Sequence, residues 1–78
     1  MKSTRYFNAT RNREDRRHIT DGWIEQVATH PAHERIQADG RIRRWAPIAE
    51  AGGRMLRVVL LADGETVHNA FFDRGFRP

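Results

Sequence analysis

The side chains of this sequence that could do chemistry are mainly arginines and histidines. Fourteen of its 78 residues are lysine or arginine, four are histidine and none is cysteine. Lys2 is the only lysine, which leaves thirteen arginines. An arginine guanidinium forms paired hydrogen bonds with phosphate and stacks on rings and bases, and histidine titrates near neutral pH. These residues favour a phosphate-bearing ligand, although the codon usage of a GC-rich genome is an alternative explanation of the arginine bias.

Two of these side chains, Arg57 and His68, are predicted to share one face of a β-sheet. The pair Asp63-Gly64 lies between two β-type runs, which is a strong hairpin signal. A two-residue turn there makes Arg57 and His68 diagonal neighbours, about 7–8 Å apart at the backbone.

A second turn, at Ala51–Gly53, brings Arg43 and Trp45 to the same open face. This assignment requires the turn to pair Glu50 with Arg54. A slip of one residue would reverse both faces, because side chains alternate along a strand. The prediction is a basic, aromatic patch on the sheet face that no helix covers: Arg43, Trp45, Arg57 and His68.

This patch predicts contact with nucleic acid, with or without catalysis. His68 could act as a general acid or base, while Arg57 and Arg43 would neutralise a phosphate. Trp45 would stack on a base, and Arg17, in the basic run Arg11–His18, would add an auxiliary contact. Each residue also has a structural interpretation: a solvent-facing strand histidine, a tryptophan that closes the rim of the core, or a solvated charged face.

Other chemistries find little support in the sequence. The absence of cysteine excludes a disulfide framework, a zinc ribbon, an iron–sulfur site and thiol catalysis. His30-Pro31-Ala32-His33, followed by Glu34, is a sparse metal motif with no third histidine nearby. The glycines form no phosphate-binding loop. We therefore predict no metal and no cofactor.

Length and charge bound the class of protein. A chain of 78 residues predicts one domain, residues 1–78, and its net charge of +4 is the remainder of alternating basic and acidic blocks. The longest apolar run, Val58–Ala62, is too short to span a membrane. The first residues, Met1–Arg5, lack the apolar stretch of a signal peptide, which favours a cytoplasmic protein.

The first half of the chain predicts a strand and one or two helices. Thr4–Phe7 is aromatic and β-branched, which suits a short strand, and the charged run Arg13–His18 could form one helical turn. A clearer helix begins at Thr20-Asp21, which supply an N-cap and a favourable negative charge. It ends before Pro31, and its apolar face consists of Trp23, Ile24, Val27 and Ala28.

The second half predicts four antiparallel strands. Asp-Gly turns at 39–40 and 63–64 and a looser turn at 51–53 separate the β-type runs. Pro47 cannot donate a backbone hydrogen bond, so its strand should be bulged or lie at an edge there. The register assigns Asn69 and Phe71 to the apolar face and Phe72 to the open face. The expected fold is α+β: an N-terminal strand and one or two helices packed on one face of a four- to five-stranded antiparallel meander.

The order of elements resembles small bacterial toxin-like proteins of the RelE/ParE and BrnT type. The residues that carry the resemblance lie between about positions 5 and 76: Arg16-Arg17-His18-Ile19-Thr20, Trp23-Ile24, Val27, His30-Pro31, Asp39-Gly40-Arg41, Leu56-Arg57-Val58-Val59-Leu60 and Val67-His68-Asn69-Ala70-Phe71. The resemblance implies an RNA- or ribosome-binding protein with metal-independent endoribonuclease chemistry on the open sheet face. Arg57 matches a basic residue on a central strand, and His68 matches a proton-transfer group on the last strand. The chain departs from the pattern in having no lysine in the sheet, and phenylalanines where such toxins often have tyrosine or histidine.

Two functions follow as hypotheses. One is binding of RNA or the ribosome by the open face, with or without cleavage. The other is a non-catalytic protein-interaction module that docks a partner, such as a small antitoxin-like protein, through the sheet edge or the Trp45 patch. The sequence predicts no membrane partner and leaves the oligomeric state open.

Overall fold

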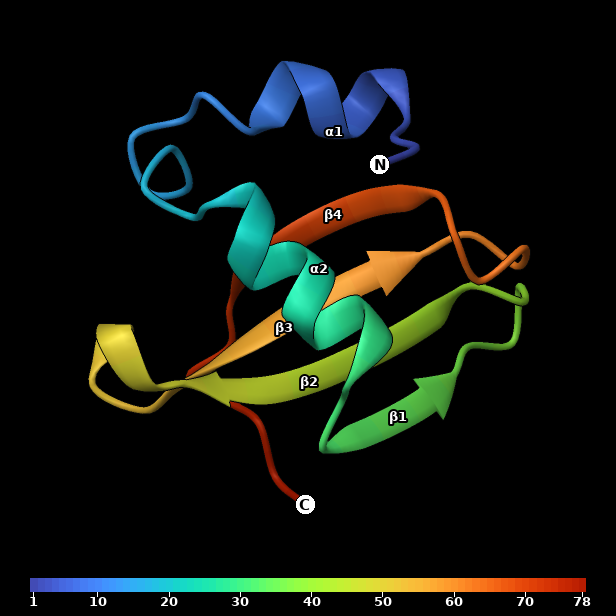
Figure 1. The fold of residues 1–78 in the computed structure, drawn as a ribbon. Helices are drawn as coiled ribbons and strands as arrows, with labels where there is room; N and C mark the ends of the chain where they lie inside the picture. The colour runs from blue at the N-terminus through green and yellow to red at the C-terminus, as the bar shows by residue number, and fades with distance from the viewer.

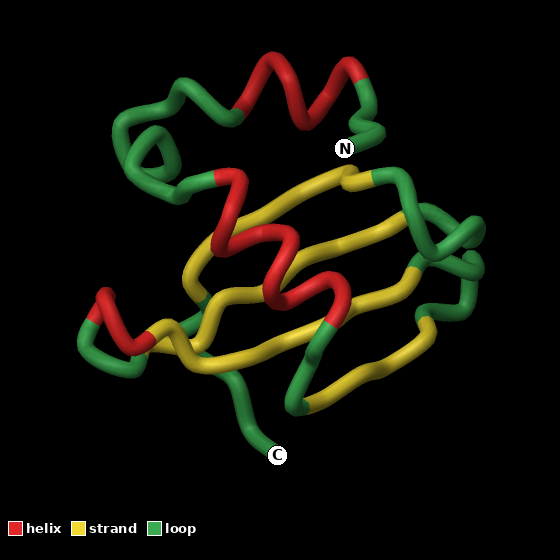
Figure 2. Tube along the Cα trace, in the orientation of Figure 1, coloured by secondary structure: helices red, strands yellow, loops and turns green.

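Two helices and a four-stranded sheet make up the fold, seen in a computed structural model that describes residues 1–78 (Figures 1 and 2). The elements are α1 (Arg5–Thr10), α2 (Asp21–Thr29), β1 (His33–Ile36), β2 (Ile42–Ile48), a short 3-10 helix (Ala49–Ala51), β3 (Arg54–Leu60) and β4 (Val67–Phe72). The strands lie in chain order, β1-β2-β3-β4, and each neighbouring pair is antiparallel. This arrangement confirms the predicted α+β meander. Neither helix is long and apolar enough to cross a membrane.

Helix α2 lies across one face of the sheet and builds the core (Figure 1). The Thr20 hydroxyl caps its first turn by accepting a hydrogen bond from the Trp23 N–H at 3.1 Å, as the sequence predicts. Ile24 and Val27 are buried against the sheet. They pack on apolar residues of β2, β3 and β4: Ala46, Ile48, Leu56, Val58, Leu60, Val67 and Ala70. Helix α2 thus covers one face of the sheet. The opposite face, which this helix does not cover, is called the open face below.

The N-terminal segment forms helix α1, so the predicted strand at Thr4–Phe7 is wrong. The Thr4 hydroxyl accepts a hydrogen bond from the Phe7 N–H at 3.1 Å and caps the helix. Phe7 and Thr10 then lie on the same side at helical spacing, and both are buried. Strand-like pairing is limited to one bridge, between Ser3 and Val67. Local capping outweighs the β preference of the aromatic residues here.

The pairing of β2 with β3 keeps the predicted faces, but the predicted pairing of Glu50 with Arg54 is wrong. Arg54 pairs with Ile48, because the 3-10 helix Ala49–Ala51 lengthens the turn. The shift is of two residues, so each side chain stays on its predicted face. Trp45 pairs with Arg57 and Arg43 pairs with Val59, so these side chains share one face. Strand β1 begins at His33, which pairs with Trp45, so no β1 residue lies opposite Pro47. Pro47 therefore lies beyond the end of the neighbouring strand, in agreement with the predicted edge position.

The pairing of β3 with β4 contains a bulge that the sequence did not predict. Leu60 pairs with Val67 as expected, but Val59 pairs with Asn69, so His68 is an extra residue in β4. Beyond the bulge every side chain changes face: Ala70 and Phe72 pack on the core, whereas Asn69 and Phe71 lie on the open face. The predicted faces of Asn69, Phe71 and Phe72 are therefore wrong. Without the bulge the polar Asn69 amide would lie inside the apolar core, which would cost free energy.

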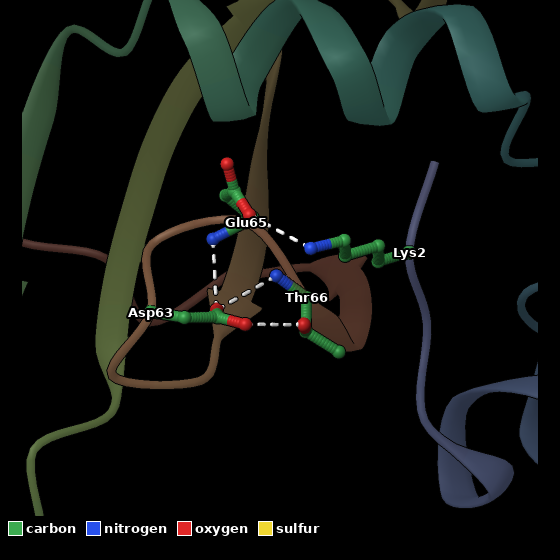
Figure 3. Close-up of polar contacts among 4 residues, drawn as sticks. All are labelled: Lys2, Asp63, Glu65 and Thr66. Atoms are coloured by element: carbon green, nitrogen blue, oxygen red, sulfur yellow. Dashed lines mark hydrogen bonds and ion pairs between the residues drawn. The ribbon is translucent and has the colours of Figure 1, made fainter.

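The turn between β3 and β4 is built by Asp63 (Figure 3). One carboxylate oxygen accepts hydrogen bonds from the backbone N–H groups of Glu65 and Thr66, both at 2.9 Å, and the other accepts from the Thr66 hydroxyl at 2.5 Å. Gly64 adopts a φ of +71°, whereas Asp63 keeps a negative φ. Leu61 and Thr66 close the loop, which therefore has four residues and not the predicted two. An ion pair between Lys2 and Glu65, 3.1 Å long, ties the N-terminus to this turn.

Acid should weaken the fold through Asp63, between about pH 3.8 and about pH 2. Hydrogen bonds from Thr66 and then from the backbone of Glu65 stabilise the carboxylate and lower the pKa of Asp63 from 3.8 to about 2. A lowered pKa adds stability above pH 3.8 that is lost as the pH falls through the folded value. Urea unfolding of the wild type and of Asp63→Asn, which cannot titrate, should therefore differ above pH 4 and converge near pH 2. A difference that stays constant across this range would contradict the assignment.

Candidate nucleic-acid interface

The open face of the sheet contains a groove of about 410 Å³. It is lined from α1, the β1–β2 turn and strands β2 to β4 by Tyr6, Gln37, Arg41, Arg43, Arg57, Val59, His68, Asn69 and Phe71. Three arginines and a histidine face this space and no carboxylate lines it. Positive charge and aromatic surface therefore dominate the groove.

Arg57 connects the groove to the neighbouring part of the open face. Its guanidinium carbon lies 5.3 Å from the centre of the Trp45 ring and 5.1 Å from that of Phe71. Its Nε lies 3.4 Å from a carboxylate oxygen of Asp73 but is buried without a hydrogen bond. Burial, followed by the charge of Arg43, lowers the pKa of Arg57, and Asp73 opposes this effect. The two rings hold the guanidinium in place, while its charge is only partly compensated.

Arg43 and Arg41 supply the positive charge at the β1–β2 end of the groove. The Arg43 Nε donates a hydrogen bond of 2.9 Å to the Gln37 side chain, and its terminal nitrogens have no partner in the protein. Arg41 is exposed, with its Nε 3.8 Å from a carboxylate oxygen of Asp39. An exposed pair at this distance contributes little stability. Both guanidinium groups can therefore bind an anion in the groove.

His68 lies in the β4 bulge, beside helix α1. Its Nδ1 is 3.0 Å from the Thr4 hydroxyl oxygen, and its ring stacks on Tyr6 with 5.0 Å between the ring centres. Burial, followed by the charge of Arg41, lowers the pKa of His68, whereas Asp39 raises it. The contact with Thr4 thus orients the imidazole ring through Nδ1. The lowered pKa favours the neutral ring, which is the form that can accept a proton.

The structure brings together three of the five residues that the sequence proposed for the site. Arg43, Arg57 and His68 line one groove, as expected if Arg57 and His68 share a face. Their assigned roles in phosphate binding and proton transfer stay predictions.

Trp45 lies on the expected face but is 2% exposed. Its indole N–H donates a hydrogen bond of 3.0 Å to Asp73, and the Phe76 ring lies 5.1 Å from its own ring, centre to centre. The C-terminal segment, which runs behind the sheet in Figure 1, provides these contacts. Protein groups therefore cover Trp45 in this conformation, with the Phe76 ring tilted by 43° against it, and a base would have to displace them.

Arg17 is exposed on the segment between the helices and does not line the groove. This segment forms turns, with one helical hydrogen bond of 2.8 Å from the Arg17 N–H to the Arg13 carbonyl. Its neighbour Arg16 reaches the sheet instead, donating a 2.8 Å hydrogen bond to Asn69 and lying over Phe71. Of these two arginines, Arg16 and not Arg17 therefore contacts residues of the open face.

The other residues that the sequence missed are Tyr6, Arg41 and Asn69. Asn69 follows from the bulge, which no local signal announced. Tyr6 reaches the face because Thr4–Phe7 is helical, and a Thr cap followed by buried residues at helical spacing was the available signal. Arg41 lies directly after the Asp39-Gly40 turn, so the turn assignment could have placed it at the rim.

The rest of the molecule contains no equally convincing ligand or metal site. The largest cavity, about 810 Å³, lies beside α2, and its single arginine, Arg44, is already paired with Glu34 and bonded to the Ala28 carbonyl. No group of three or more histidine, cysteine or acidic side chains is placed to hold a metal. His30 contacts Thr29, and His33 packs on Phe76.

The groove of about 410 Å³ on the open face, here called the arginine groove, is therefore the candidate site. Its function is inferred from its geometry alone. The chain matches no protein-family model, no curated protein and no solved structure.

Proposed function

We propose that the open-face groove binds the phosphodiester backbone of single-stranded RNA. The observation that carries the proposal is the lining of the groove: three arginines, a histidine and no carboxylate. Guanidinium groups bind phosphate oxygens through paired, charge-assisted hydrogen bonds. The resemblance to RelE/ParE and BrnT toxins, and with it a ribosomal target, stays a prediction.

The electrostatics of Arg43 and Arg57 support an anionic ligand. Burial and then the positive charge of Arg43 lower the pKa of Arg57, so the two arginines repel one another. The terminal nitrogens of Arg43 have no acceptor, and the buried Nε of Arg57 has no hydrogen bond. A phosphate between these side chains would offset their repulsion and supply acceptors to the terminal nitrogens of Arg43.

The aromatic side chains of the groove favour a single strand over a duplex. Tyr6 and Phe71 line the same space as the arginines, and Tyr6 is 46% exposed. Unpaired bases can stack on such rings, whereas the bases of a duplex are stacked on one another.

Salt dependence tests the proposal directly. We expect a fluorescein-labelled six-nucleotide oligouridine to bind, with fluorescence anisotropy as the readout. If three phosphates are neutralised, log K should fall with log salt at a slope of about −2, which is roughly a 20-fold loss between 50 and 200 mM salt. A slope near zero would contradict phosphate binding and favour the protein-interaction hypothesis. Since Trp45 is covered, that alternative would use the exposed edge strand β1.

RNA cleavage is a second candidate, favoured by the environment of His68. In this scheme Nδ1–H donates to Thr4, and the other ring nitrogen accepts the proton of a ribose 2′-hydroxyl. The 2′-oxygen then attacks phosphorus and the bond to the 5′-oxygen breaks, which gives a 2′,3′-cyclic phosphate. The leaving 5′-oxygen takes a proton from water to form a 5′-hydroxyl, and His68 releases the proton it accepted to the solvent. Arg57 and Arg43 would stabilise the extra negative charge on the phosphate.

The cleavage hypothesis predicts a large effect of His68→Ala. Removal of a general base lowers the rate by about 10²–10⁴-fold, measured on ribosomes or total RNA with end-mapping of the products. Tyr6→Phe, which keeps the ring that stacks on His68, serves as the matched control. Equal cleavage by wild type and a His68→Ala, Arg57→Ala double variant would remove both residues from catalysis.

A further inference from the structure

The C-terminal segment Arg74–Pro78, here called the strap, crosses the open face of the sheet and covers Trp45 (Figure 1). The ring centre of Phe76 lies 5.1 Å from that of Trp45 and 4.9 Å from that of His33. The Phe76 side chain thus packs the strap against both β2 and β1.

The attachment of the strap is weak beyond its first residues. Asp73, just before the strap, is anchored by a backbone hydrogen bond of 2.9 Å to the Met55 carbonyl and by the Trp45 indole. After Gly75, whose N–H binds the Asp73 carboxylate, no backbone–backbone hydrogen bond joins the strap to the sheet. One side-chain hydrogen bond, from Arg35 to the Arg77 carbonyl, is 3.5 Å long. The position of the strap therefore depends mainly on the packing of Phe76.

The strap interrupts a basic surface. A second cavity, of about 290 Å³, lies along it. Its charged lining consists of four arginines, one of them from the strap, and one acidic side chain: Arg35, Arg43, Arg57, Arg77 and Asp73. Arg43 and Arg57 also line the arginine groove. The two spaces meet at these two side chains, so they form one positive path across the sheet.

Phe76 ends a row of alternating rings and guanidinium groups on this path. Arg16 lies over Phe71, Arg57 lies between Phe71 and Trp45, and Phe76 packs on Trp45. A nucleobase has the same flat, polarisable face as the Phe76 ring and would meet the same Trp45 surface.

We propose that Phe76 occupies a base-stacking subsite on Trp45, and that a base of single-stranded RNA displaces it. The inference rests on the proposed function, since the arginine groove must first bind the backbone. Arg35 and Arg77 then contact the phosphate next to the stacked base. The strap keeps Trp45 out of water when no RNA is bound.

The test follows Trp45 fluorescence in a Trp23→Phe background, which leaves Trp45 as the only tryptophan. Phe76→Ala and Phe76→Leu are compared with this parent for binding of a six-nucleotide oligouridine and of an abasic oligomer of equal length. We expect oligouridine to quench Trp45 and to bind both variants about fivefold more tightly, from the lower range of base–aromatic stacking. The abasic oligomer should bind all three proteins equally. Phe76→Leu keeps an apolar side chain beside Trp45 and serves if Phe76→Ala does not fold.

Two failures can be told apart. If the parent binds oligouridine with steep salt dependence but the folded variants gain nothing, the strap proposal fails and the proposed function stands. Equal gains for the abasic oligomer would also overturn the subsite, because they would come from charge alone. If neither the parent nor the variants bind oligouridine at low salt, the proposed function fails and the subsite with it.

Discussion

Arg43→Gln should lower the affinity for oligouridine by about tenfold or more and leave the fold intact. Loss of one charge-assisted hydrogen bond to phosphate corresponds to about 1.5–3 kcal/mol. The slope of log K against log salt should become shallower by about 0.7 for each phosphate of the single strand that is no longer neutralised. The side chain has no ion pair in the protein, so the free energy of unfolding should change by less than about 0.5 kcal/mol. Fluorescence anisotropy and urea unfolding measure both effects.

Arg13→Gln is the matched control for this experiment. Arg13 is exposed between the helices, and its side chain makes no hydrogen bond or ion pair. The substitution removes the same charge from a place outside the groove. Equal losses for Arg13→Gln and Arg43→Gln would show that net charge, and not the groove, binds RNA. That result would favour genome composition as the explanation of the many arginines.

The sequence predicted the sheet faces well where turns and alternation agree. Helix α2 has an explicit cap at Thr20, and three of the four core-side positions in β2 and in β3 are apolar, with Arg44 and Arg54 at the fourth. These local patterns were sufficient to place Arg43, Trp45 and Arg57 on one face. His68 joined them for a different reason from the predicted one, because as the extra residue of a bulge it is not in the predicted pairing.

The errors share a physical origin in interactions that are remote in sequence. The β4 bulge is favoured because it takes Asn69 out of the core. On the open face Asn69 accepts a hydrogen bond from Arg16, which lies 53 residues earlier in the chain. The covering of Trp45 depends on Phe76, which lies 31 positions away in an irregular segment. Neither interaction has a local signature, since turn chemistry and periodicity report only on neighbours along the chain. The charge of the open face was therefore predictable, whereas its shape was not.

Arg57→Leu should destabilise the protein by about 1–3 kcal/mol and also abolish RNA binding. Leucine leaves the Asp73 carboxylate, whose side chain is 16% exposed, without its cation and removes the stacking on Trp45 and Phe71. The Trp45 and Gly75 N–H groups still bind this carboxylate, which keeps the loss below that of a fully buried pair. For a domain of this size the melting temperature should fall by about 4–8 °C per kcal/mol. Urea unfolding followed by tryptophan fluorescence measures the change.

Arg57→Lys separates the contribution of Arg57 to stability from its contribution to RNA binding. Lysine keeps the positive charge but lacks the planar group that stacks between the rings, so stability should be only partly restored. If RNA binding returns with the charge while stability does not, the site needs the charge of Arg57 and the fold needs its shape. Equal stability of Arg57→Leu and wild type would contradict the structural part. Because Arg57 supports the fold, loss of activity in an Arg57 variant identifies a functional residue only at a temperature where the variant is folded.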